Sequence, residues 1–240
     1  PMERWNADDT SSIGYDTLSE TILARQRQAG FLRDLELFDN KFFGISPSEA
    51  GVMEPQQRLV LERGYEALQG SDLTKPSLIG SLTGVFVGMW ASEFTDIIKG
   101  GKMARSVYAA TASTCSVASG RVSFALGLQG PCQSIDTACS SGLVAGHSGL
   151  RAVQNREATT SLVIGTNTIF SQHASLTMAL AGMTSAAGHS HTFDSRADGY
   201  TRGEGCYAAT LQVRDDKASM QLMGSAVQHD GKSASLTAPN

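Results

Sequence analysis

The sequence predicts an α/β fold with a largely parallel sheet. Short apolar and β-branched runs alternate with longer segments whose apolar residues have helix-compatible spacing. This alternation is typical of strands that are joined by helices lying on the faces of one sheet. The length of 240 residues is sufficient for one domain with a sizeable core, and the chain contains no internal repeat.

The runs that predict strands are β-rich and are bounded by glycine or polar residues. They lie at 84–89, 160–165, 206–213 and 220–227, and a further run ends at Cys139. Helices are expected at 21–28, 55–68, 116–126 and 178–183, and from about Ser140 to Asn155. Ser46, Pro47 and Glu49 indicate one more helix start, with capping-box spacing. Residues 188–205 are expected to form a charged loop punctuated by glycines.

Composition argues against several classes of partner. The net charge is −4 and no basic run occurs, which argues against nucleic-acid binding. No uninterrupted apolar stretch is long enough to span a bilayer, so we expect no membrane insertion. The four cysteines form no CxxC pair and no metal-site pattern, and they indicate a reducing compartment, with cytoplasm and plastid both open.

Residues 134–145 are the stretch around which the chain is organised. We interpret them as a strand, a sharp turn and a helix, with Cys139 at the turn and Ser140 or Ser141 capping the helix. The partial positive charge of a helix N-terminus favours a thiolate, and its free N–H groups can hold an oxyanion. The alternative is a buried structural cysteine. The turn, the cap and the small residues on one side of the helix favour a nucleophile.

The stretch Asp136-Thr137-Ala138-Cys139-Ser140-Ser141 resembles the active-site motif of β-ketoacyl synthases, specifically the ketosynthase domains of modular type I polyketide synthases. Four further blocks occur in family order. They are Phe42–Pro47 with Met53–Leu59, Gly120–Phe124 with Gly127–Pro131, Thr192–Asp194 with Ala197–Gly205, and Leu236–Asn240. The blocks extend over nearly the whole chain, which is far more specific than a single short motif.

The resemblance implies the thiolase-like fold, a layered αβαβα domain built from two similar halves. Residues 1–240 are then expected to be a partial ketosynthase domain, truncated at both ends, that holds most of the first half and the opening strand of the second. The family works as a homodimer with contacts near the nucleophile strand. The expected partners are acyl carrier protein and other polyketide synthase domains.

The implied activity is that of an acyltransferase. Cys139 would accept an acyl chain from the phosphopantetheine arm of acyl carrier protein, and a malonyl-type extender would then lose carbon dioxide and attack the thioester. No bound cofactor and no metal are expected. The two histidine motifs that handle the extender in this family do not occur in the sequence. The isolated chain is therefore expected to be inactive.

Other candidate residues have plainer interpretations. The neighbourhood of Met178 and Met183 borders the acyl tunnel in the family, so these two are candidate substrate-pocket residues. His147 lies too far along the helix from Cys139 for a thiol–imidazole hydrogen bond, and packing is the better interpretation. His229 is expected to have a structural role in a loop. His189 and His191 with Asp194 are too few ligands for a convincing metal site.

The remaining charged residues and thiols are read as structural. The charges from Asp194 to Glu204 are expected to pair within their own loop. Arg58 and Arg121 are expected to make structural ion pairs or hydrogen bonds. The other cysteines, at positions 115, 132 and 206, are expected to be packed small residues.

Three alternatives remain beside the polyketide ketosynthase. A fatty-acid-type condensing enzyme is the near neighbour, and the long matches at 42–59 and 194–205 favour the polyketide type. A non-catalytic ketosynthase-like partner would have replaced the nucleophile, so Cys139 argues against it. A cysteine hydrolase needs a base and an orienting group, and no histidine here has a motif that fits.

Overall fold

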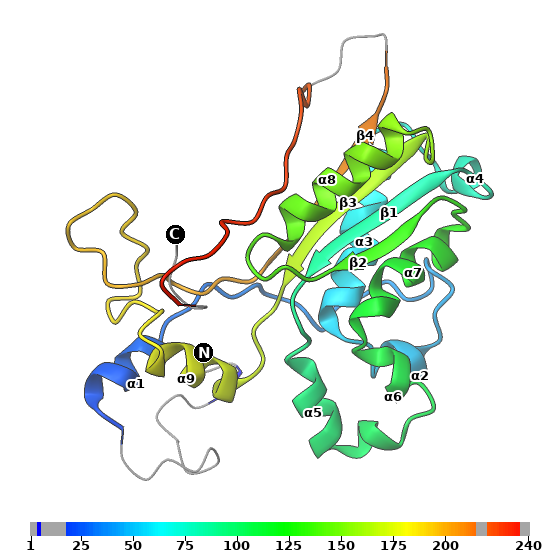
Figure 1. The fold of residues 1–240 in the computed structure, drawn as a ribbon. Coiled ribbons are helices and arrows are strands. Elements are labelled where there is room, and N and C mark those ends of the chain that lie inside the picture. Colours follow the sequence, from blue (N-terminus) through cyan, green and yellow to red (C-terminus); the bar gives the residue numbers. More distant parts are fainter. Residues whose placement is uncertain (1–3, 6–17, 215–219, 236–240) are drawn as a thin grey trace.

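A four-stranded sheet is the centre of the fold (Figure 1). The structure is a computed structural model that describes residues 4–5, 18–214 and 220–235. The strands are β1 (Thr83–Met89), β2 (Cys132–Ile135), β3 (Thr160–Asn167) and β4 (Gly205–Gln212), and their order is β2-β1-β3-β4. β1 pairs in parallel with β2 and β3, and β4 pairs antiparallel with β3. The predicted α/β class with a largely parallel sheet is confirmed.

Helices precede β1 and also occupy the connections between the strands. They are α1 (Glu20–Gln26), α2 (Pro47–Ala50), α3 (Pro55–Gln69), α4 (Lys75–Leu78), α5 (Phe94–Gly100), the 3₁₀ helix η2 (Lys102–Arg105), α6 (Ala109–Ala112), α7 (Cys115–Leu126), α8 (Ser141–Gln154) and α9 (Gln172–Leu180). The predicted start at Ser46 is confirmed, because its hydroxyl accepts from the Glu49 N–H at 3.2 Å.

The sheet is covered on both faces. Alternate residues of a strand point to opposite faces, so each strand contributes to two cores. On one face Val85, Val87 and Ile164 pack with α3 and α7, and on the other Phe86 and Val163 pack with α8. Figure 1 shows α8 in front of the sheet and α3 behind it. Burial on both faces explains why the centres of β1 (Val85–Val87) and β3 (Leu162–Ile164) have consecutive apolar residues rather than alternating ones.

The small residues of α8 allow it to lie very close to the sheet. A Cβ at Gly149 would be 2.8 Å from Val163 Cγ2, and Ala145 is fully buried. At the start of the helix, a Cβ at Gly88 of β1 would overlap the backbone of Ser141 and Gly142. The bare side of this helix that the sequence predicted therefore faces β1 and β3.

Two predicted element ends and one predicted strand were wrong. β2 ends at Ile135 rather than at Cys139, because the turn begins at Asp136. α9 ends at Leu180 instead of continuing to 183, where Gly182 has a φ of 70°. Residues 220–227 form no strand among the described residues, since they run as chain without a pairing partner and Met223 is 90% exposed.

The carboxylate of Glu54, just before α3, is an ionisable group in the core. The residue is fully buried, and its Oε1 accepts a hydrogen bond from Gln56 Nε2 at 2.6 Å. Burial raises the pKa of Glu54 from 4.5 to about 7. The folded protein therefore binds this proton more tightly than the unfolded chain does, and the stability due to this group is lost as pH rises through that interval.

We expect the Glu54→Gln variant to have a flatter pH dependence of stability than the native protein. Between about pH 5 and pH 8 the native protein should lose about 3 kcal/mol through this group, whereas a neutral amide should lose none. Thermal unfolding of both proteins across this range measures the difference. Glu66→Gln, at an exposed ion pair with Arg63, is the matched control. Parallel curves for Glu54→Gln and the native protein would contradict the prediction.

Candidate active site

A sharp turn joins β2 to α8. Ala138 has a φ of 54°, the left-handed conformation that a residue with a side chain seldom adopts. Two side chains hold this turn. Asp136 Oδ1 accepts from the Ala138 N–H at 3.0 Å, and Ser141 Oγ accepts from the Thr137 N–H at 2.9 Å. The predicted strand–turn–helix is confirmed, with a strained backbone immediately before Cys139.

Cys139 is exposed and lies two residues before the first residue of α8. The predicted serine cap was wrong. Ser140 is the N-cap residue, but its backbone is helical (φ −87°, ψ −1°) and its hydroxyl donates to Thr137 O at 2.8 Å. A capping side chain requires an extended backbone at that residue. The hydroxyl of Ser141 also folds the turn, by donating to Ala138 O at 2.6 Å.

Tyr200 contacts both of the predicted pocket residues. Its hydroxyl donates to Met178 Sδ at 3.3 Å, and its backbone N–H donates to Met183 O at 3.0 Å. The pKa of Tyr200 is raised, and burial is the main cause. Arg202 acts in the opposite direction and lowers the pKa, and Cys139 raises it by a smaller amount. The structure thus brings Met178, Met183 and Tyr200 together. Sequence reasoning missed Tyr200, although its position inside a matched block was a usable signal.

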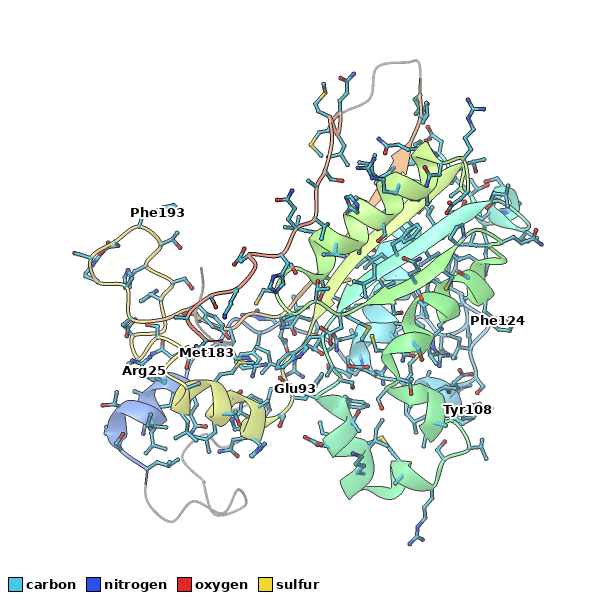
Figure 2. The ribbon with its side chains drawn as sticks, in the orientation of Figure 1. Arg25, Glu93, Tyr108, Phe124, Met183 and Phe193 are labelled. Carbon is cyan, nitrogen blue, oxygen red and sulfur yellow. The ribbon has the colours of Figure 1, made fainter. Side chains whose placement is uncertain are left out.

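Met183 contributes to this neighbourhood through its backbone, because its side chain is 48% exposed. Figure 2 shows Met183 beside Arg25 of α1, whose guanidinium donates to the Thr184 carbonyl. Phe193 lies far from both, at the tip of the following loop, with a φ of 61° and a fully exposed ring (Figure 2).

The loop of residues 188–204 is held by an ion pair within the loop and by contacts with other segments of the chain. Asp194 and Arg196 pair as expected, at 2.7 Å on the surface, and this pairing lowers the pKa of Asp194 to about 2. Arg202 instead forms a buried ion pair with Glu93, at the start of α5, and donates to Ser175 Oγ at 2.7 Å. The prediction of a self-paired loop was therefore wrong for Arg202.

Glu204 also reaches outside the loop. Its carboxylate is buried and pairs with Arg4 at 3.1 Å, and it accepts from the N–H groups of Leu32 and Ile169, each at 2.8 Å. Glu93 makes the same use of its carboxylate, because it accepts from the N–H of Phe170 at 2.9 Å. Both acids therefore anchor the chain that follows β3, next to the segment that carries Tyr200.

Arg202→Leu should destabilise the folded protein by about 3 kcal/mol, because it leaves the Glu93 carboxylate buried without its cationic partner. Arg196→Leu, in the same loop, removes an exposed pair and should leave stability nearly unchanged. Chemical denaturation of the two variants and the native protein tests the contrast. Equal effects of the two substitutions would show that the Arg202–Glu93 pair does not stabilise the loop.

Two of the histidines use Nδ1 in hydrogen bonds with other residues of the chain, and neither bond involves the thiol. His147 Nδ1 is hydrogen-bonded to Ser225 Oγ at 2.8 Å, and His229 Nδ1 accepts from the Gly231 N–H at 2.8 Å. The rings of His189 and His191 are 5.7 Å apart. In the described part of the chain, no three His, Cys, Asp or Glu side chains gather as metal ligands would.

Two of the three other thiols are packed as predicted. Cys115 and Cys206 are half-buried against the core between the sheet and α3, and burial raises the pKa of Cys206 to about 11. Cys132 was predicted to be packed, but it is exposed because β2 is an edge strand. Its Sγ donates to Ser119 Oγ at 3.2 Å.

The two arginines have the predicted structural roles. Arg121 pairs with Glu49 and donates to Gln57 Oε1 at 2.7 Å. Arg58 donates to the Met53 carbonyl at 3.0 Å.

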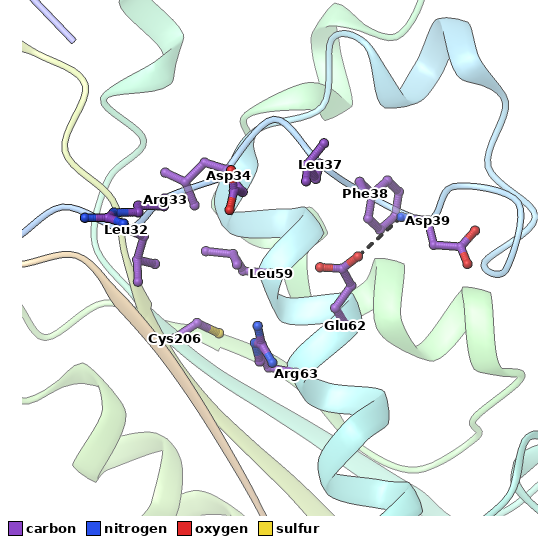
Figure 3. A pocket seen from close by; sticks show the side chains of 11 residues that line it. Leu32, Arg33, Asp34, Leu37, Phe38, Asp39, Leu59, Glu62, Arg63 and Cys206 are labelled. Carbon is purple, nitrogen blue, oxygen red and sulfur yellow. Dashed lines mark hydrogen bonds between the residues drawn. The ribbon is translucent and has the colours of Figure 1, made fainter. Parts of the chain in front are cut away.

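A cavity of about 630 Å³ lies between α3, the segment 32–39 and the start of β4 (Figure 3). Its lining mixes apolar and charged side chains, among them Leu35, Phe38, Leu59, Glu62, Arg63 and Cys206. Glu62 accepts there from the Asp39 N–H at 3.3 Å (Figure 3). Neither Cys139 nor the two predicted pocket methionines line it, so this cavity is separate from the turn.

Comparison with known proteins defines the class of this site. The model of the β-ketoacyl synthase N-terminal domain matches residues 1–217. A phenolphthiocerol/phthiocerol polyketide synthase polypeptide of Mycobacterium tuberculosis is 38% identical over all of this chain and 11% of its own length. A highly reducing polyketide synthase of Fusarium pseudograminearum is 40% identical over 83% of this chain and 8% of its own length.

Solved structures agree with the sequence matches. The ketosynthase from module 6 of the bacillaene synthase of Bacillus subtilis superposes with a TM-score of 0.84 at 32% identity, covering all of this chain and 40% of its own. The oxazolomycin ketosynthase domain of Streptomyces albus gives a TM-score of 0.74 at 27% identity, over 89% of this chain and 37% of its own.

The chain therefore belongs to the β-ketoacyl synthase family. Within that family it belongs with the ketosynthase domains of polyketide synthases, and it has the first half of their thiolase-like fold. It spans only a small part of these curated relatives, between 8% and 16% of their lengths.

The matched block Leu236–Asn240 lies outside the described residues. No helix in the described ranges is long and apolar enough to cross a membrane.

Proposed function

We propose that this chain supplies the nucleophile of a polyketide ketosynthase, with Cys139 as the residue that carries the acyl chain. The supporting observation is an exposed thiol, held by the strained turn at Ala138, directly before the N-terminus of α8. The backbone N–H groups of that region point out of the helix start and can stabilise a negative charge. Cys206, with a pKa near 11, is protonated at neutral pH and is a poor competitor.

The proposed reaction has two steps. The Cys139 thiolate attacks the carbonyl carbon of an acyl-phosphopantetheine thioester, the carbon–sulfur bond to the carrier breaks, and the carrier thiol leaves as the acyl group moves to Sγ. A malonyl-type extender then loses carbon dioxide, and its α-carbon attacks the acyl carbonyl and expels the Cys139 thiolate. The product is a β-ketoacyl chain on the carrier, longer by two carbons.

The chain is proposed to act as part of a larger ketosynthase domain. The two histidine motifs that handle the extender in the family do not occur in residues 1–240, so that task falls to residues outside them. Met178 and Met183 are proposed to border the acyl chain. The contacts of Tyr200 with Met178 Sδ and Met183 O support this placement beside Cys139.

The proposed partners are acyl carrier protein, other polyketide synthase domains and a second copy of the domain. Acyl substrates arrive on phosphopantetheine, and the reaction requires no bound metal or other cofactor. The exposed edge strand β2 and the 90% exposed Phe124 of the neighbouring α7 support a homodimer contact at that edge (Figure 2). An uncovered sheet edge beside a large apolar side chain is otherwise an aggregation hazard.

Incubation of the complete polypeptide with an acyl-phosphopantetheine thioester should produce one acyl adduct on Cys139. Intact-mass spectrometry with peptide mapping measures the adduct. Cys139→Ala should abolish it because the attacking sulfur is gone, whereas Cys132→Ala, which removes another exposed thiol, should leave it unchanged. Acylation that persists in Cys139→Ala would overturn the assignment of the nucleophile. A folded dimer that forms no adduct would favour a non-catalytic ketosynthase-like role.

The dimer is tested separately by sedimentation of the complete domain. We expect a dimer that is weakened by Phe124→Lys, because a charge would be buried at the contact. Leu180→Lys, at an exposed position on α9, is the control. A monodisperse monomer of the native domain would contradict the proposed contact.

A further inference from the structure

Tyr207 of β4 occupies a space that exists only because two of its neighbours are glycines. Its register partner in β3 is Gly165, and a Cβ at Gly165 would overlap the edge of the phenol ring. A Cβ at Gly142, in the first turn of α8, would overlap the Tyr207 hydroxyl oxygen and lie 3.0 Å from Cζ. The ring therefore fits between β3 and the start of the nucleophile helix.

The alternation of β4 explains why this side chain reaches α8. Cys206 and Ala208 pack against the core on the α3 side of the sheet, so Tyr207 between them points to the opposite face. Further along the same face, Leu211 packs against the apolar cluster beneath the middle of α8. Tyr207 thus meets the first turn of the helix, and Leu211 meets its body.

Two contacts then hold the start of α8 from different directions. Gly88 of β1 lies against the backbone of Ser141 and Gly142, and Tyr207 lies against Gly142 from β4. Gly142 is three residues beyond Cys139 and belongs to the turn of helix whose N–H groups lie behind the thiol. A displacement of Gly142 therefore moves the groups that surround the nucleophile.

We propose that Tyr207 is a positioning residue for the reaction at Cys139, with its ring wedged between Gly165 and Gly142 so that the first turn of α8 is fixed behind the thiol. This inference rests on the proposed function of Cys139. The ring edge lies against Gly165, and the hydroxyl oxygen and Cζ lie against Gly142. Tyr207 is 53% exposed, so its truncation removes the wedge without emptying the core.

The first test compares Tyr207→Ala, Tyr207→Phe and Leu211→Ala in the complete polypeptide. Two quantities are measured: the rate of acylation of Cys139, and the pH at which its alkylation by iodoacetamide is half-maximal. Tyr207→Ala should slow acylation about tenfold and shift the alkylation midpoint to higher pH, because the helix N-terminus favours the thiolate less when it is displaced. Tyr207→Phe keeps the ring against Gly165 and loses only the hydroxyl oxygen nearest to Gly142, so it should slow acylation less than Tyr207→Ala does.

Leu211→Ala is the matched control for a loss of stability alone. It removes packing from the same face of the same strand, and it should lower the melting temperature without moving the alkylation midpoint. A folded Tyr207→Ala protein with native acylation and a native midpoint would overturn the proposal. An equal midpoint shift in Leu211→Ala would overturn it as well, since the effect would then be a general one.

The second test uses the contact between the Tyr207 side chain and the backbone of Gly142. Gly142→Ala should slow acylation because the added methyl group overlaps the Tyr207 hydroxyl oxygen. Adding Tyr207→Ala should relieve the overlap, so that the double variant is no slower than Tyr207→Ala alone. Additive losses would overturn the proposal. If the native protein is not acylated at all, the proposed function fails, and the alkylation midpoints still decide whether Tyr207 positions the turn.

Discussion

The close backbone contact between Gly88 of β1 and the start of α8 is the constraint on which the rest of the site depends. Without a side chain at Gly88, the carbonyl of Ser141 and the N–H of Gly142 lie directly on the strand. The helix start is then fixed relative to a fully buried β-strand, the least mobile part of the fold. The short, strained turn at Ala138 follows from this, because a few residues must connect the end of β2 to a helix that is already in place.

Two buried acids, Glu93 and Glu204, fix the chain by hydrogen bonds and ion pairs rather than by close backbone packing. Glu93 and Glu204 use charged carboxylates to gather backbone N–H groups from Leu32, Ile169 and Phe170, which belong to no strand or helix. Such groups are costly to bury unpaired. Each acid also has an arginine partner, so the charge is balanced where it is buried. These N–H groups of irregular chain thereby have hydrogen-bond partners without a strand or helix to supply them.

Much of this architecture could be predicted from the sequence. β1 and β3 are buried on both faces and so have consecutive apolar residues at their centres, and the small residues of α8 indicated its close packing. Features set by distant partners could not be predicted in this way. Arg202 and Glu93 are separated by 109 residues, and the exposure of Cys132 depends on which strand lies at the edge of the sheet. Tyr207 looked like an ordinary strand residue because its contact with Gly142 is visible only in the fold.

The ion pair between Arg4 and Glu204 has a consequence for how the protein folds. The two residues are 200 positions apart, so the loop that they close includes almost all of the described chain. Closure of so long a loop is entropically unfavourable until other contacts have shortened it. On the ribosome, β1, β2 and α8 emerge well before β4, and the contact forms only when synthesis has passed residue 204. The Arg4–Glu204 contact therefore forms only after the whole of the nucleophile helix has been synthesised.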